Sequence, residues 1–506
     1  MPARRLRYTV IKDLEGRYFM HYIGIDLGTS ACKFLLTDEK GNILNIVSEE
    51  YPLEFPQPGW SQQEPADWWK AVKLGIPRLL DGFNAEEVAG IGCGGQMHGL
   101  VVLNADDEVI RPAILWNDGR TQAQTEYLNN EIGKEILSER TANIAFAGFT
   151  APKLLWMKET EPERFAKISK IMLPKDYINY KLTGIHCTDY SDAGGMLLLD
   201  VEHKCWSAPM LKISGITEQQ MPRLYESWEC VGTLTQEAAD ELGLPASVKV
   251  CAGAGDNAAA AVGCGVVGAG GCNISLGTSG TIFITDSNFS VDPHNALHSF
   301  PHADGGFHLM GCILSAASCN KWWIEEILKT NDYNGEQAPI TEEKLGHNDV
   351  YYLPYLMGER SPHNDPSARG AFLGLRMDTA REDMTQAVME GVAFAFRDCL
   401  DIARAQGIAV DVSRVCGGGA KSPLWRRILS NVLGITLELP QTEQGPGYGG
   451  AMLAAVACGE YPDVITCARA LTSVKETTVP EPALVKAYEA KYQVWKKIYP
   501  ALKGIL

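Results

Sequence analysis

The part of this sequence best suited to chemistry is an acid followed by a small-residue turn. Residues 253–257 read GAGDN, and residues 274–280 read ISLGTSG. In the first segment Asp256 follows a predicted strand, where its carboxylate can take a proton from a hydroxyl group. In the second segment the turn at 277–279 joins two predicted strands, and its small residues allow backbone N–H groups to approach a phosphate. Together the two segments predict transfer of a phosphate group to a hydroxyl.

The glycine-containing turn occurs twice in the chain. Residues 25–30 read IDLGTS and residues 274–279 read ISLGTS, each between two predicted strands. An internal repeat of this kind predicts two domains of the same topology, each presenting one turn to a shared cleft. Only the first copy carries an acid, Asp26, which can reach a metal ion held by phosphate oxygens. An aspartate that merely caps the turn is the alternative that the local sequence leaves open.

Two further segments suit a small hydroxylated ligand. Residues 94–99 read GGQMHG after a predicted strand, and the glycines allow the loop to close on a ligand. A purely structural role is the alternative for His98. Residues 116–120 read WNDGR and combine an aromatic face with an acid and a base, a mixture typical of sugar sites. The alternative here is a solvated surface pair of Asp118 and Arg120.

Three other segments carry glycine near predicted strands or helices. Residues 417–420 read GGGA between a predicted strand and a predicted helix, an arrangement that binds nucleotides at the helix N-terminus. Residues 449–455 read GGAMLAA and predict a small-residue helix used for packing. The loop at 189–195 contains Asp189 and Asp192, and both helix capping and ligand contact stay open for these two acids.

Composition places the chain among globular proteins. Its 506 residues, 45% of them hydrophobic, are enough for two or three domains. The net charge of −17 argues against nucleic acid or an anionic membrane as the main partner. No apolar run approaches the roughly 18 residues of a membrane span. The 14 cysteines include no CxxC pair, so we expect reduced thiols and a cytoplasmic protein.

Residues 1–19 stand apart from the predicted fold. They are basic, with Arg4, Arg5 and Arg7, and a second methionine, Met20, immediately precedes the first convincing strand. Either this segment is a disordered extension or the natural start is Met20. It lacks the serine-rich character of a transit peptide. We therefore expect the fold to begin after residue 20.

Taken together, the motifs resemble those of the FGGY carbohydrate kinases. The resemblance is carried by IDLGTS, QMHG, WNDGR, GDN, SLGTSG and GGGA, in this order, between Tyr22 and about Gly459. It implies two ribonuclease-H-like α/β domains, as in actin, Hsp70 and hexokinase, flanking a cleft for ATP and sugar. It also implies a sugar-binding domain at 21–268 and a nucleotide-binding domain at 269–506, after the extension at 1–20.

The same resemblance assigns roles to the matching residues. Asp256 would be the catalytic base, and Asp26 would hold Mg²⁺, through water. Such a base needs no strongly raised pKa, because a hydroxyl attacking a loose phosphoryl centre loses its proton late. The D-xylulose site would be lined by Met97, His98, Asp256 and Asn257. The ATP contacts would come from Gly28, Thr29, Gly277, Thr278, Ser279, Trp322, Gly418 and Gly419.

The implied activity is ATP-dependent phosphorylation of a small-molecule sugar, with ATP and Mg²⁺ as its other requirements. Within the family the match is closest to members that phosphorylate D-xylulose at the 5-hydroxyl. Family members acting on ribulose, gluconate, rhamnulose or glycerol are the nearest alternative. An ATPase module similar to actin or Hsp70 is the alternative from another class, and the GDN and QMHG motifs oppose it. A homodimer, common among similar enzymes, is one of the open oligomeric states.

Overall fold

The computed structural model describes residues 20–442 and 444–505 of the chain. The predicted extension at residues 1–19 lies outside these described residues. The described chain divides into two compact units, each centred on a seven-stranded sheet and each made of several segments. Unit 1 contains residues 20–267, 300–305 and 444–472, and unit 2 contains residues 268–299, 306–442 and 473–505.

The sheet of unit 1 has the strand order β13-β14-β5-β1-β2-β3, and the short strand β15 also pairs with β5. Strand β1 is antiparallel to β2 and parallel to β5, while β2 is antiparallel to β3. Strand β1 is buried along nearly its whole length, as expected for an apolar strand with a neighbour on each side. The strands are β1 (His21–Leu27), β2 (Ala31–Asp38), β3 (Ile43–Glu50), β5 (Val88–Gly95), β13 (Cys230–Thr233), β14 (Lys249–Cys251) and β15 (Ala254–Gly255).

The sheet of unit 2 repeats this arrangement, with the order β24-β23-β22-β16-β17-β19-β18. Strand β16 is antiparallel to β17 and parallel to β22, and β17 is antiparallel to β19. The two predicted α/β domains of one topology, each with a glycine turn after its first strand, are therefore confirmed. The strands are β16 (Cys272–Leu276), β17 (Gly280–Asp286), β18 (His298–Pro301), β19 (Phe307–Ile313), β22 (Val412–Cys416), β23 (Thr436–Pro440) and β24 (Val474–Thr478).

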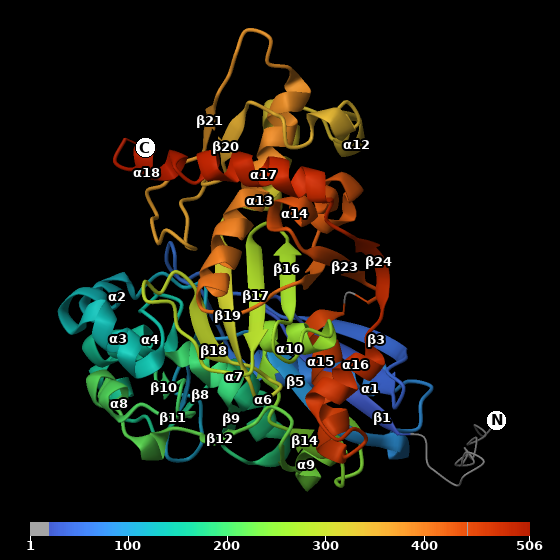
Figure 1. Cartoon of the computed structure of the whole chain (residues 1–506). Coiled ribbons are helices and arrows are strands. Elements are labelled where there is room, and N and C mark those ends of the chain that lie inside the picture. Colours follow the sequence, from blue (N-terminus) through green and yellow to red (C-terminus); the bar gives the residue numbers. More distant parts are fainter. Residues whose placement is uncertain (1–19, 443, 506) are drawn as a thin grey trace. The chain divides into compact units, whose positions relative to one another are not determined.

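Helices pack against each sheet (Figure 1). In unit 1, α1 packs on β2 and β3, and α10 and α15 pack on each other and on β5. In unit 2, the long helix α13 packs on β17, β19 and α14, and α14 packs on α17. The helices of unit 1 that position the site are α1 (Pro65–Leu79), α4 (Thr150–Thr160), α6 (Pro174–Thr183), α7 (Tyr190–Ala193), α10 (Asp256–Gly263) and α15 (Gly445–Cys458). Those of unit 2 are α11 (Ala317–Lys321), α13 (Arg381–Ala405), α14 (Pro423–Leu433) and α17 (Pro482–Trp495).

Helix α15 packs against the strands of unit 1. Its segment, residues 444–472, is predicted in the second domain but packs in unit 1. Glycine makes this contact possible, because a Cβ atom on Gly24 would lie 1.8 Å from the carbonyl oxygen of Gly447, and one on Gly92 would lie 2.1 Å from that of Gly450. Backbone meets backbone along this glycine seam between α15 and strands β1 and β5. The predicted role of the small-residue helix in packing is confirmed.

Candidate active site

Asp256 is the first residue of helix α10, directly after strand β15. Its Oδ1 atom accepts hydrogen bonds from the backbone N–H of Asn257 at 2.7 Å and from the side-chain amide of Asn257 at 3.1 Å. Burial, followed by the negative charge of Asp26, raises the pKa of Asp256 to about 7. A late proton transfer does not require this shift, but a pKa near neutrality is the value at which a general base is most effective.

Asp26 lies near the end of strand β1, opposite Lys33 on β2 and Gly94 on β5. Burial raises its pKa to about 6, although the positive charge of Lys33 opposes the shift. The effect of Asp26 on the pKa of Asp256 places the two predicted acids in one electrostatic environment. They come together because β5 pairs with β1 on one edge and with β15, which leads into Asp256, on the other.

Asp26 and Asp256 suit a divalent cation whose other ligands are water and phosphate oxygens. Among the described residues, no group of three or more His, Cys, Asp or Glu side chains is arranged to hold a metal ion. A Mg²⁺ ion commonly binds one or two carboxylates and completes its coordination with water and phosphate oxygens. A partly exposed carboxylate such as that of Asp26 suits this mode of binding.

The loop after β5 brings Met97 and His98 to the same region. Gly255, next to Asp256, packs so closely that a Cβ atom on it would lie 2.9 Å from Cγ of Met97. The side-chain amide of Asn257 donates to the sulfur of Met97 at 3.8 Å. The Nδ1 atom of His98 lies 2.8 Å from the carbonyl oxygen of Gly195, which can only accept, so Nδ1 donates a proton to it.

Lys153 of helix α4 supports this loop, and sequence reasoning missed its role. His98 has a left-handed backbone, with φ of 68°, which a non-glycine residue adopts only when its surroundings hold it. Its carbonyl oxygen accepts hydrogen bonds from Nζ of Lys153 at 2.7 Å and from Oγ1 of Thr150 at 3.1 Å. Burial lowers the pKa of Lys153 well below its usual value, so its amino group binds this carbonyl without requiring a partner anion.

In the WNDGR segment, the acid and the base pair with each other. Both side chains of Asp118 and Arg120 are fully buried and form an ion pair at 2.7 Å. The Arg120 guanidinium also lies 3.9 Å from the ring centre of Trp60. A buried pair therefore replaces both the predicted sugar contacts and the alternative surface pair. Trp116 and Asn117 stay exposed, Trp116 at 48%, and the indole N–H of Trp116 donates to Oγ1 of Thr29 at 3.0 Å.

Unit 2 contains a pocket of about 790 Å³ between its two glycine turns. The turns follow the parallel neighbours β16 and β22, whose ends meet at one edge of the sheet. Four residues predicted to contact ATP line this pocket together: Gly277, Thr278, Gly418 and Gly419. Sequence reasoning missed Asn320, which also lines the pocket, is 4% exposed, and has an Oδ1 atom without a hydrogen-bond partner. Such a buried acceptor is suited to a donor on a ligand.

The other predicted ATP contacts lie outside the lining of this pocket. Ser279 is exposed at the end of its turn. Trp322 packs against the core of unit 2, with its ring 6.4 Å from that of Trp323. Gly28 and Thr29 lie in the corresponding turn of unit 1, where the N–H of Gly28 donates to the carbonyl oxygen of Ala31 at 3.0 Å. Their contacts with ATP stay predictions.

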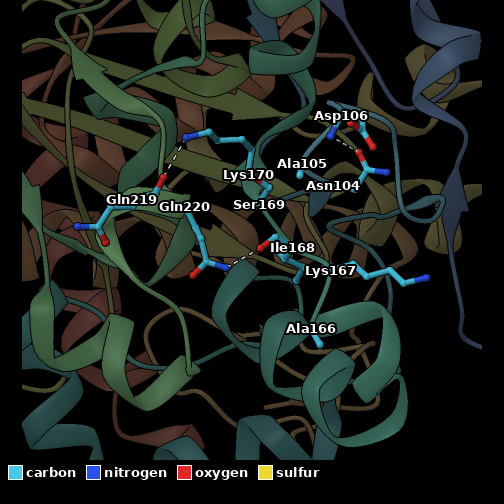
Figure 2. Close-up of a pocket in the computed structure, with 10 residues that line it drawn as sticks. All are labelled: Asn104, Ala105, Asp106, Ala166, Lys167, Ile168, Ser169, Lys170, Gln219 and Gln220. Carbon is cyan, nitrogen blue, oxygen red and sulfur yellow. Dashed lines mark hydrogen bonds between the residues drawn. The ribbon is translucent and has the colours of Figure 1, made fainter.

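A larger hollow of about 850 Å³ lies on the surface of unit 1, and Figure 2 shows its lining. Its polar groups already bind one another: Nζ of Lys170 donates to the carbonyl oxygen of Gln219 at 3.0 Å, and Nε2 of Gln220 donates to that of Ile168 at 2.8 Å. None of the predicted site residues lines it. Size alone therefore does not identify the site.

Across the described segments, no helix has both the length and the apolar character needed to cross a bilayer.

Comparison with known proteins decides the family. The sequence matches the N-terminal domain of the FGGY family of carbohydrate kinases over residues 21–263 and the C-terminal domain over residues 272–458. The chain belongs to the FGGY family of carbohydrate kinases. This FGGY kinase is 39% identical to the xylulose kinase of Escherichia coli strain K12 over 487 residues, which cover 96% of this chain and 100% of that protein. It is 36% identical to the xylulose kinase of Bacillus subtilis strain 168 over 488 residues, covering 96% and 98%.

The solved structures that match this chain are sugar kinases named for more than one sugar. A crystal structure from Brucella ovis, described as a xyloylose kinase, matches this FGGY kinase with a TM-score of 0.91 and 40% identity, covering 96% of this chain and 100% of that chain. The gluconate kinase from Lactobacillus acidophilus matches with a TM-score of 0.90 and 26% identity, covering 96% and 98%. Because both sugars occur on this fold, the fold alone does not select the substrate.

Proposed function

We propose that this FGGY kinase transfers the γ-phosphate of ATP to the 5-hydroxyl of D-xylulose, giving D-xylulose 5-phosphate and ADP. The observation that carries the proposal is the carboxyl of Asp256, which Asn257 holds through two hydrogen bonds and which follows Gly255, packed against Met97. Its pKa of about 7 suits a general base. The full-length relatives named xylulose kinase support D-xylulose as the sugar. Its place in metabolism would be pentose catabolism.

In this reaction Asp256 takes the proton of the 5-hydroxyl as the hydroxyl oxygen attacks the γ-phosphorus. The bond between that phosphorus and the bridging oxygen breaks, and its electron pair leaves with ADP. His98 would contact another sugar hydroxyl, and Asn257 would keep the carboxylate of Asp256 in place through its two hydrogen bonds. These chain groups therefore supply positioning and one proton transfer, which is what phosphoryl transfer mainly requires.

The nucleotide would bind in the pocket of unit 2. The turns containing Gly277, Thr278 and Gly418 would present backbone N–H groups to the phosphates, and Asn320 would offer its acceptor to a donor on the base or ribose. We propose Asp26 as the residue that holds Mg²⁺ through water. When bound there, Mg²⁺ neutralises charge on the β- and γ-phosphates.

A second candidate function is phosphorylation of another sugar used by the family. The structural match to the gluconate kinase, with a TM-score of 0.90, favours this alternative. The deciding experiment is a coupled ADP-release assay on D-xylulose, D-ribulose, L-rhamnulose, gluconate and glycerol, with the product identified by mass. We expect kcat/KM for D-xylulose to exceed that of the others at least about tenfold. A higher kcat/KM for gluconate or another sugar would show that this sugar, and not D-xylulose, is the substrate. ADP release without a phosphosugar would instead indicate an ATPase module.

The cellular setting is proposed on separate grounds. We propose that the enzyme acts in the cytoplasm, where its cosubstrate ATP is available and thiols stay reduced. Cysteines such as Cys93, Cys251 and Cys272 are buried thiols. Burial raises the pKa of Cys251 and Cys272 to about 12 and that of Cys93 well above its usual value, which keeps them unreactive. A homodimer stays a prediction from the family resemblance, and light scattering of the purified chain would test it.

A further inference from the structure

A buried ion cluster lies beside the segment that leads to Asp256 in unit 1. It contains one cation, Lys175, whose Nζ lies 2.7 Å from Asp176, 2.9 Å from Asp189 and 3.6 Å from Asp192. All four side chains are fully buried. Burial alone would lower the pKa of Lys175, but the three carboxyls together raise it well above its usual value. Lys175 is therefore a fixed positive charge that holds Asp189.

Asp189 passes this constraint to Ser191. Its Oδ2 atom accepts hydrogen bonds from the backbone N–H of Ser191 at 2.8 Å, from the Ser191 hydroxyl at 2.5 Å and from the Ser227 hydroxyl at 2.8 Å. The Ser191 hydroxyl in turn accepts the backbone N–H of Gly255 at 3.2 Å. Gly255 immediately precedes Asp256. A continuous chain of contacts thus runs from the buried lysine to the residue before the base.

We propose that Ser191 is a positioning residue for Asp256: held by Asp189 and Lys175, its hydroxyl fixes the backbone of Gly255 and so sets where the carboxylate of Asp256 lies. This inference rests on the proposed function in taking Asp256 as the base. It does not depend on which sugar is phosphorylated. It also explains why Asp189, which caps helix α7, is paired with a fully buried lysine that capping alone does not need.

The segment before Asp256 depends on such anchors. Strand β15 has only two residues, and Gly253 before it has a positive φ of 74°. Upstream, the side-chain amide of Asn179 binds the carbonyl oxygen of Ala252 at 2.8 Å. Loss of the Ser191 hydroxyl leaves the N–H of Gly255 without that acceptor while these upstream anchors stay. Because a displacement of about 1 Å at a catalytic group can cost up to about 100-fold in rate, a small local shift is enough to be measured.

The test compares Ser191→Ala with Ser227→Ala. Both substitutions remove a buried hydroxyl that donates to the same oxygen of Asp189, but only Ser191 also binds Gly255. Ser191→Cys, nearly the same size but a weak acceptor, is measured alongside, since it disturbs packing least. The readouts are kcat and KM for sugar and ATP, the dissociation constant of ADP, and the thermal unfolding midpoint. Rates are expressed per mole of folded protein.

We expect both Ser191 variants to lose at least about tenfold in kcat, with KM for ATP and ADP affinity within about twofold of wild type, and Ser227→Ala to keep kcat within about twofold. Equal losses in the Ser191 and Ser227 variants, or no loss in the Ser191 variants, would overturn the proposal. Failure of the proposed function would look different, because wild type itself would then not phosphorylate D-xylulose. The comparison would be repeated with the sugar that it does phosphorylate.

Discussion

The negative charge of Asp26 adds to burial in raising the pKa of Asp256 to about 7, while burial raises the pKa of Asp26 itself to about 6. As the pH rises, Asp26 therefore ionises first, and its charge then holds the proton on Asp256 to higher pH. A general base must be ionised to accept a proton. The titration of Asp256, which is the later of the two, consequently controls the pH dependence of the reaction rate.

The pH dependence of turnover follows from this order. We expect kcat/KM, which reports the titration of the free enzyme, to rise about tenfold per pH unit below pH 7 and to level off above about pH 8, because the fraction of ionised Asp256 rises in that window. The control is Asp398→Asn in unit 2: burial also raises the pKa of Asp398 to about 7, but its carboxylate accepts the Tyr492 hydroxyl and no proposed substrate. A kcat/KM that is flat from pH 5.5 to pH 9, or an acidic limb that disappears in Asp398→Asn, would contradict the assignment of the titration to Asp256.

Asp26→Asn separates nucleotide use from sugar binding. We expect kcat/KM for ATP to fall about 100-fold at fixed Mg²⁺, because the proposed carboxylate partner of the ion is lost. D-xylulose affinity, measured by calorimetry, should stay within about threefold of wild type, since Asp26 is not proposed to touch the sugar. The acidic limb of the residual activity should also shift to lower pH, because the negative charge of Asp26, which raises the pKa of Asp256, is gone. Lost sugar affinity with unchanged use of ATP and Mg²⁺ would contradict this role.

Two adjacent glycines of the nucleotide pocket should respond differently to alanine. A Cβ atom on Gly418 would meet no atom within 4 Å, whereas one on Gly419 would lie 2.6 Å from the side chain of Leu276. We expect Gly418→Ala to fold normally and to weaken ADP binding about tenfold, because the methyl group would occupy space in the pocket. Gly419→Ala should instead lower the thermal unfolding midpoint. Calorimetric titration with ADP and thermal denaturation check the two effects, and unchanged ADP affinity in Gly418→Ala would count against this nucleotide site.

The glycine seam predicts a large effect on stability. In Gly24→Ala the new methyl group would lie 1.8 Å from the carbonyl oxygen of Gly447, and backbone atoms cannot move aside as a flexible side chain can. We expect the free energy of unfolding of unit 1 to fall by at least about 3 kcal/mol. Denaturant titration followed by tryptophan fluorescence measures this loss, with Gly418→Ala as the control substitution into open space. A loss below about 1 kcal/mol would show that the seam can open without cost.

Features with a local cause could be predicted from the sequence. The turns at 28–30 and 277–279 are flanked on both sides by apolar strands, and each strand-turn-strand pattern is complete within about 20 residues. Their repetition then predicts one topology twice, as the two sheets show. The small-residue helix α15 is likewise predictable as a packing element, because alanine and glycine leave its surface open to close contact.

Features set by distant packing could not be predicted. Whether Asp118 and Arg120 are exposed depends on Trp60, which covers the guanidinium from another segment. The place of α15 in unit 1 depends on contacts such as that of the Tyr448 hydroxyl with the carbonyl oxygen of Gly41, 407 residues away in sequence. No local pattern in the sequence encodes such pairings.

The acids of the loop at 189–195 have one feature that could be predicted from local sequence and another that depends on distant packing. Capping by Asp189 is a local property, and the structure shows it through the N–H of Ser191. Its ion pair with Lys175 and the link from Ser191 to Gly255 join three separate segments of unit 1. Sequence reasoning could therefore name the acid but not its partners. Asp192, which has no hydrogen bond on either oxygen and whose pKa burial raises well above its usual value, is explained only by its place beside Lys175.

The central claim is that Asp256 is the base in phosphorylation of D-xylulose by ATP. The most direct test is the steady-state turnover of D-xylulose by Asp256→Asn, with Asp398→Asn as control and with circular dichroism to establish that both variants are folded. The account predicts that kcat falls by about 10²- to 10⁴-fold in Asp256→Asn, because the amide cannot accept the proton, and stays near wild type in Asp398→Asn. Undiminished turnover by a folded Asp256→Asn protein would contradict it.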